Sequence, residues 1–516
     1  MSASRERKKR MAQEQPAPEV KMPEKKKLSS GWIFAICMIL VVALTFGSIA
    51  IYRAAWANTK IMSVGAHDIY QKEFNYFYNS QVNAFSSYAQ YMGIDTTVGL
   101  DKQKVTSNGA MYMGLFGMDT TALAELTADE DGNYSITWAQ LLANNAMRTA
   151  ASFYSVYDEA QAAGYTLGEE SLAAVESTIS DVEAQAATYG VTADELLEQA
   201  FGYGSNLETY RSYLELSQTY YDYPVTVRDN YTADEVAARY DGNEQEFDVV
   251  SFYSFSTTAS DYVETDEDGN KLDVTDENRD EAKKAAEAMA EDFDVENEKV
   301  SITADHVRED LTSEMTEECA NWLFDEAEVG DVKMFTKEAE SEDGEDTYYV
   351  VKLLANADYP MANIQRIYVE GHQHSEDETE EDHEAEAAAL AETLEAIRSG
   401  LKEDASRENF LALAEEYAAE GSDVELSNQT RANMTSSKEM SAWLYDEERT
   451  EGDYAEFEVN GNTIFVFFDG YGESRKDYYV KNTLASEWLE ELADKAVENC
   501  NYNEKAALHA NVSVYG

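Results

Sequence analysis

The amino-acid sequence predicts an α+β protein with a single N-terminal transmembrane helix, an all-helical domain, two α+β domains in tandem and a C-terminal helix. Three observations support this prediction: a long apolar run near the N-terminus, helical periodicity in the part that follows, and one strand-and-helix unit that occurs twice. The expected segments are a basic arm over residues 1–31, the transmembrane helix over 32–52, the helical domain over 53–243, the tandem domains over 244–357 and 358–471, and the C-terminal helix and tail over 472–516.

The apolar run over residues 32–52 contains no charged side chain, and about 20 such residues in a helix span the hydrocarbon core of a bilayer. Nine basic and four acidic residues precede it, so the arm has a net charge of +5 (9 − 4). Because basic flanks stay in the cytoplasm, we expect a single-pass cell-membrane protein with a cytoplasmic N-terminus and extracytoplasmic C-terminal domains. A signal peptide cleaved after Ala57 is the alternative; the length of the run and Arg53 favour a retained anchor.

The whole chain has 516 residues and a net charge of −63. That length requires more than one hydrophobic core, and the 34 Tyr and 19 Phe residues supply apolar surface for packing. So strong a negative charge repels phosphate groups, which excludes nucleic acid as a partner. Outside the apolar run the only cysteines are Cys319 and Cys500, and the sequence leaves open whether they pair or stay free.

The helical domain is expected to begin with a strand over 60–65, and residues 93–134 are expected to form loops and short elements. Its expected helices cover residues 69–92, 137–163, 167–189, 192–201, 207–221 and 232–240. Pro224 is expected to mark a joint, since proline interrupts a helix. The last helix, over 477–499, has apolar residues at helical spacing, so we expect it to pack back on the helical domain.

The tandem domains share one order of elements. Each has a strand, one or two helices, a Trp-Leu-aromatic-Asp-Glu segment, a Gly-Asp pair and a closing hairpin. The segments WLFDEAEVGD at 322–331 and WLYDEERTEGD at 443–453 differ in length by one inserted residue. Repetition of the whole series favours duplication over two unrelated α+β domains.

The segments SVGAHDIYQKEFNYFY at 63–78, SITWAQLL at 135–142 and TADEVAARYDGNEQEF at 232–247, together with the doubled unit, resemble the membrane-anchored foldases of the PrsA and SurA type. These proteins join a SurA N-terminal-like chaperone domain to parvulin-type prolyl isomerase domains. The resemblance implies an extracytoplasmic chaperone or foldase that binds unfolded exported polypeptides.

The expected isomerase histidines are missing, because parvulins carry one on the first strand and one on the last. In the second domain Arg366 takes the first position and Ile464 or Phe465 the other, and the corresponding strands of the first domain contain none. We therefore expect non-catalytic binding domains. An active peptidyl-prolyl isomerase is the alternative, and a structural or adhesive surface protein is the third class.

The candidate peptide-binding residues are Arg366, Met434, Met440, Phe465 and Phe467. Methionine adapts to varied partners, aromatic rings supply apolar area, and an arginine can donate to a peptide carbonyl. The alternative is that the methionines and phenylalanines are core residues, since the sequence does not indicate which face of the last strand is buried. No catalytic residue is assigned.

No nucleophile elbow, phosphate-binding loop or zinc-protease motif occurs, so we expect no cofactor. His372, His374 and His383 lie in an acidic loop without fixed geometry, and a solvated loop is the preferred interpretation over a metal site. The segment Asp129–Asn133 lacks the alternating ligands of an EF-hand and is expected to be a turn.

Overall fold

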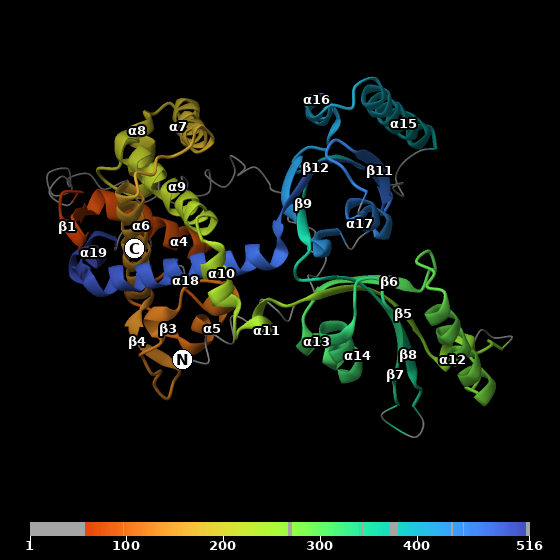
Figure 1. Ribbon diagram of the computed structural model, residues 1–516. Helices are drawn as coiled ribbons and strands as arrows, with labels where there is room; N and C mark the ends of the chain where they lie inside the picture. Colours follow the sequence, from red (N-terminus) through yellow and green to blue (C-terminus); the bar gives the residue numbers. More distant parts are fainter. Residues whose placement is uncertain are drawn as a thin grey trace. The chain divides into compact units, whose positions relative to one another are not determined.

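The computed structural model describes residues 57–511, except residues 96, 267–270, 340, 342–343, 372–379, 435–436 and 447. Two compact units make up this part of the chain (Figure 1). Residues 232–481 form one, called here the tandem unit, and the residues before and after them form the other, called the terminal unit. The terminal unit is therefore discontinuous in sequence.

The prediction of a membrane-spanning helix requires correction. The predicted arm and span, residues 1–31 and 32–52, lie outside the described residues. Among the described residues, no helix is long and apolar enough to cross a bilayer. The reason is composition: α6 (Trp138–Ala162) has 25 residues but carries Arg148, Asp158 and Glu159. The predicted single-pass fold class, membrane contact and cell-membrane localisation are corrected accordingly, and the described chain is a mixed helix-and-sheet protein.

The terminal unit is not all-helical, which is a second correction. Its helices are α4 (Gln71–Ser86), α5 (Ser107–Leu115), the 3-10 helix η1 (Thr121–Leu123), α6, α7 (Glu169–Tyr189), α8 (Ala193–Phe201), α9 (Leu207–Asp229), the later part of α18 (Arg475–Asn499) and α19 (Glu504–Asn511). Its strands are β1 (Lys60–Val64), β2 (His67–Tyr70), β3 (Lys104–Thr106), β4 (Asn133–Thr137) and β13 (Asn501–Tyr502). The strands form one sheet of order β13-β1-β2 and a separate β3-β4 pair. The sheet needs residues from both ends of the described chain, and local periodicity carries no information about such pairing.

The core of the terminal unit lies between α4 and α6. Phe74, Phe77 and Phe85 project from α4 at helical spacing and are buried with Trp138 at the start of α6. Thr137 and Gln140 form a capping box that fixes this start. The later part of α18 packs Trp488, Leu489 and Leu492 against a second cluster that contains Val156 of α6 and Tyr223 of α9.

The tandem unit opens with α10 (Ala233–Tyr240) and α11 (Glu244–Phe247) and contains two modules. The first has β5 (Val250–Thr257), η2 (Ala259–Tyr262), α12 (Asp276–Glu291), β6 (Val300–His306), α13 (Arg308–Glu314), α14 (Glu317–Asn321), η3 (Trp322–Glu326), β7 (Val332–Lys337) and β8 (Thr347–Asn356). The second has β9 (Pro360–Val369), α15 (Glu380–Glu403), α16 (Arg407–Tyr417), β10 (Glu425–Gln429), η4 (Arg431–Met434), α17 (Lys438–Leu444), β11 (Tyr454–Val459) and β12 (Asn462–Ser474), which leads into α18.

The two modules have the same sheet topology. The strand orders are β6-β5-β8-β7 and β10-β9-β12-β11, so each series runs second, first, fourth, third along the chain. In each module a glycine with positive φ donates its amide to the last strand: Gly330 to the carbonyl of Leu353 at 2.8 Å, and Gly452 to that of Phe468 at 2.9 Å. The edge strands β6 and β10 are absent from the sequence prediction, because each is partly polar.

Helices cover both faces of each sheet (Figure 1). In the second module α15 and α16 bury Ile397 and Phe410 against one face, and α17 buries Met440 against the other. In the first module α12 covers one face, and α13 and α14 cover the other with Leu311 and Cys319. Since each face is covered, side chains from both faces are packed into cores.

Candidate functional site

The five predicted peptide-binding residues do not lie together. Phe465 and Phe467 project from β12 toward α15 and α16, where they are core residues. Met434 and Met440 lie on the opposite face of the sheet, only 4% and 6% exposed, in a cluster with Ile464, Val466 and Phe468. The alternation of side chains along β12 makes this separation unavoidable.

Arg366 lies on the same face of the sheet as the two methionines, and its partner on the neighbouring strand β12 is Val466. Its guanidinium donates through Nε and Nη2 to the carbonyl oxygen of Asp423, at 3.3 and 3.2 Å. Burial lowers the pKa of Arg366. The side chain is therefore engaged within the module, and its contact with a peptide stays a prediction.

The histidines of the acidic loop lie where no side chain is described: His372 and His374 belong to the gap at 372–379, and only the backbone of His383 is placed. Among the described side chains no group of three or more metal-ligating residues occurs. At the segment Asp129–Asn133, the Asp129 carboxylate accepts the amides of Asp131 and Asn133 at 3.1 and 2.8 Å, the geometry of a turn.

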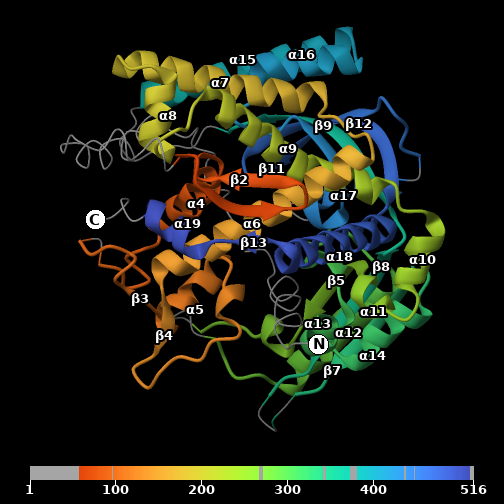
Figure 2. The ribbon, with the colours of Figure 1, turned by 90° about the vertical axis from the view of Figure 1, so that its left-hand side faces the viewer.

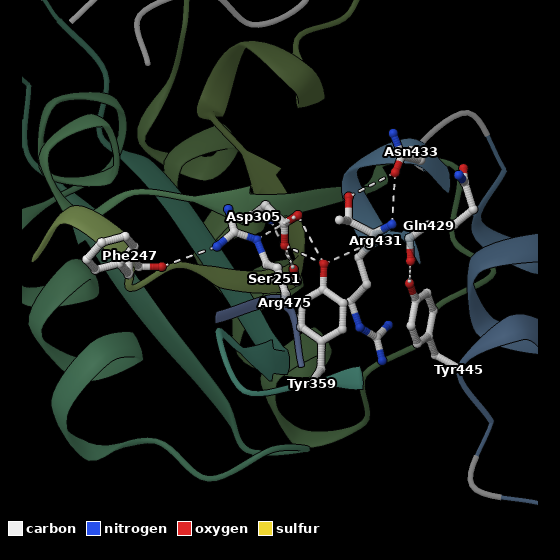
Figure 3. Close-up of polar contacts among 10 residues, drawn as sticks. Phe247, Ser251, Asp305, Tyr359, Gln429, Arg431, Asn433, Tyr445 and Arg475 are labelled. Carbon is white, nitrogen blue, oxygen red and sulfur yellow. Dashed lines mark hydrogen bonds and ion pairs between the residues drawn. The ribbon is translucent and has the colours of Figure 1, made fainter. Parts of the chain in front are cut away.

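A buried polar network joins the two modules of the tandem unit, and its centre is Asp305 (Figure 3). The Asp305 side chain is 7% exposed and pairs with Nε of Arg475 at 3.2 Å. The hydroxyl of Tyr359 donates to both carboxylate oxygens, at 2.8 and 3.0 Å. Arg475 also donates from Nη1 to the carbonyl of Phe247 at 3.2 Å. The network therefore joins the end of β6, the link between the modules and the start of α18.

The position of Asp305 depends on an unusual backbone conformation, with φ of 53°. Asp and Asn tolerate this left-handed region better than most residues. Asn428, at the corresponding point of β10, has the same φ. In each module the amide of this residue donates to the first strand, to Oγ of Ser251 at 3.0 Å and to Oδ1 of Asn363 at 2.9 Å. Each residue lies at a register shift of its strand, and the two irregularities are equivalent, but only the first carries a carboxylate.

Two further cations complete the junction between the modules. The guanidinium of Arg431 lies over the rings of Tyr359 and Tyr445, 5.6 and 4.2 Å from their centres, and burial lowers its pKa. Lys438 Nζ donates to the carbonyls of Val295 and Val300 at 2.9 and 3.0 Å. These contacts fix one module against the other, so we assign the junction a structural role.

In the terminal unit α5 lies beside β3 and β4 (Figure 2). Apolar side chains on and near this helix are exposed and form a surface. We call it the aromatic surface. Met111 and Leu115 of α5 are 58% and 71% exposed, and Tyr91, which follows α4, is 53% exposed. The Phe116 ring stacks on Tyr88 at 4.3 Å between centres and lies near Tyr91 and Tyr112, at 5.9 and 6.1 Å. The surface is defined by Tyr88, Tyr91, Met111, Tyr112, Leu115 and Phe116.

Local sequence holds α5 in place below this surface. The Thr106 side chain caps the helix by accepting the amide of Gly109 at 3.0 Å. Gly109 packs directly on Trp138, since a Cβ there would lie 2.7 Å from the ring. Met113 is buried on the same side. With these residues turned inward, Met111 and Leu115 are left facing solvent.

The sequence does not predict this surface, because it predicts loops and short elements for residues 93–134. A signal was present: residues 105–118 contain no charged side chain, between Lys104 and Asp119, in a chain of net charge −63. That run lacks the periodicity of an amphipathic helix, so it gave no helix prediction. The Asp305 junction had no sequence signal, since its members are far apart in the chain.

No protein-family model matches the chain, and no curated protein matches it. Among solved structures the chain is similar to the crystal structure of foldase protein PrsA from Streptococcus pneumoniae. The identity is 12%, the match covers 52% of this chain and 86% of that chain, and the TM-score is 0.15. A likeness with this TM-score assigns the chain to no family and carries no argument about its function.

Proposed function

We propose that the protein is a chaperone that binds apolar segments of unfolded polypeptides on the aromatic surface. The observation that carries this proposal is the exposure of Met111 and Leu115 beside the stacked rings of Phe116 and Tyr88. Contiguous exposed apolar side chains on a soluble unit are typical of interaction sites. Methionine and aromatic side chains adapt to partners of varied sequence, which suits an unfolded client.

Charge favours a polypeptide client over other occupants of this surface. The chain has a net charge of −63, and residues 57–231 alone have −16 (7 basic − 23 acidic). A second copy of the chain would bring the same charge, and nucleic acid or anionic headgroups would also be repelled. An unfolded segment with exposed apolar side chains is not opposed in this way. The resemblance of the sequence to PrsA and SurA type foldases points in the same direction.

We expect the two modules to be non-catalytic in this function. Lowering the barrier of about 18–20 kcal/mol to rotation about a prolyl bond requires a shaped, accessible pocket around the imide. Met434 and Met440 are buried, and β5, β8, β9 and β12 contain no histidine. The full-length protein should therefore not accelerate the proline-limited refolding of a model substrate. Acceleration that depends on protein concentration would favour the isomerase alternative.

The proposal predicts the effect of two substitutions on α5. Met111→Gln together with Leu115→Gln removes exposed apolar side chains but keeps good helix formers, so the fold should be unchanged. A buried side chain of this size contributes about 1.5–3 kcal/mol. We therefore expect affinity for an unfolded client to fall at least about tenfold, and suppression of client aggregation, followed by light scattering, to fall with it.

The matched control is Leu172→Gln on α7, which replaces a leucine that is 44% exposed at a site away from the aromatic surface. It should suppress aggregation as the unmodified protein does. Equal suppression by the α5 double variant would contradict the proposal. Circular dichroism of both variants checks that helix content is retained.

A further inference from the structure

We infer that the aromatic surface selects apolar segments flanked by lysine and arginine, an inference that rests on the function proposed above. The surface itself is apolar and its helix α5 carries no charge. Its selectivity comes from the carboxylates that surround it. A client segment with cationic residues beside its aromatic or aliphatic residues would satisfy both features at once.

Acidic residues predominate around α5 in the chain. Residues 86–131 contain seven acidic and two basic side chains, which gives −5 (2 − 7). Asp95 lies four residues after Tyr91, and Asp119 lies three residues after Phe116. At about 3.8 Å per residue the Cα atoms of these two residues lie within roughly 15 Å of the aromatic surface. That distance exceeds the Debye length of about 10 Å at 0.1 M salt but lies within the length of about 30 Å at 0.01 M, so the two carboxylates act on a bound segment at low salt.

Two of these carboxylates pair with cations and, among the described residues, others do not. Asp119 pairs with Arg148 at 3.4 Å, and Asp129 lies 4.0 Å from Lys104. In the described part of the chain, no ion pair is found for Asp95 or Glu125, and both are exposed. Hydrogen bonds from the side chain and amide of Thr97 lower the pKa of Asp95, which keeps it ionised.

The field of the whole chain acts in the same direction as these local charges. A net charge of −63 attracts cationic segments at long range and raises their rate of encounter. A neutral apolar segment gains only the contact with the aromatic surface, and an acidic one is repelled. The class of client is therefore a cationic, aromatic- or aliphatic-rich segment of an unfolded chain.

The test uses the full-length protein and three peptides with one common core of Phe, Leu and Tyr, flanked by Lys, Gln or Glu. At low salt we expect the Lys-flanked peptide to bind about tenfold more tightly than the Glu-flanked peptide, with the Gln-flanked peptide between them. High salt should remove most of the difference. Equal affinities would overturn the charge selection and leave the proposed function intact, whereas no binding of any of the three would overturn the proposed function itself.

A pair of variants locates the selection. Asp95→Asn with Glu125→Gln should weaken the Lys-flanked peptide several-fold and leave the Gln-flanked peptide unchanged; asparagine can still form the turn made by Asp95. Asp181→Asn with Glu183→Gln on α7 makes the same change of net charge elsewhere. If both pairs weaken binding equally, the selection comes from net charge alone and the local assignment is overturned.

Discussion

Deletion of residues 500–516 is expected to unfold the terminal unit. The deletion removes β13, whose Tyr502 pairs with Met62 of β1, and α19, whose Ala507 is fully buried. The Tyr502 ring also lies 6.2 Å from that of Phe74. Each large side chain that loses its burial costs about 1.5–3 kcal/mol. Several such losses approach the whole stability of a domain, about 5–15 kcal/mol.

Hydrogen exchange followed by mass spectrometry distinguishes the two units within one molecule. Peptides from α4 and α6 should lose protection in the deletion variant, whereas peptides from β5 and β9 of the tandem unit should keep theirs. Deletion of residues 512–516 alone, which leaves β13 and α19 in place, is the control and should exchange as the full chain does. Unchanged protection of α4 after the longer deletion would contradict the prediction.

Asp305→Asn is expected to lower the free energy of unfolding of the tandem unit by about 3–5 kcal/mol. The substitution preserves shape and tolerates the φ of 53°, but it leaves Arg475, 10% exposed, without its counter-ion. A buried charge without a partner costs about this much, because its desolvation is no longer offset. Exchange protection in β5, β6 and β9 measures the loss.

An exposed ion pair in the same unit provides the matched control. Arg308 and Asp325 have side chains 34% and 56% exposed, and Asp325→Asn should cost less than about 1 kcal/mol. Arg475→Met added to Asp305→Asn should restore part of the stability, since it removes the uncompensated charge. A loss from Asp305→Asn no larger than that from Asp325→Asn would show that the junction contributes little.

The sequence alone determined most of the helices, because their signals are local. Thr192 and Glu195 form the capping box that begins α8, and Gly190 has the left-handed conformation that ends α7. The repeated WLFDE and WLYDE segments at 322–326 and 443–447 predicted two equivalent modules, and the common sheet topology has the same order in both. The helix caps and the repeated segments are each formed by residues within a few positions of one another.

Tertiary structure decided what depends on distant residues. Pro224 was expected to mark a joint but lies inside α9, where buried Leu216 and Tyr223 hold the helix despite a cost of about 3 kcal/mol. Both faces of β12 are apolar, so period-two alternation could not show that Phe465 packs under helices on one side and Ile464 on the other. Exposure of Leu115 and burial of Asp305 follow from which segments pack against them, and that information is not local to either residue.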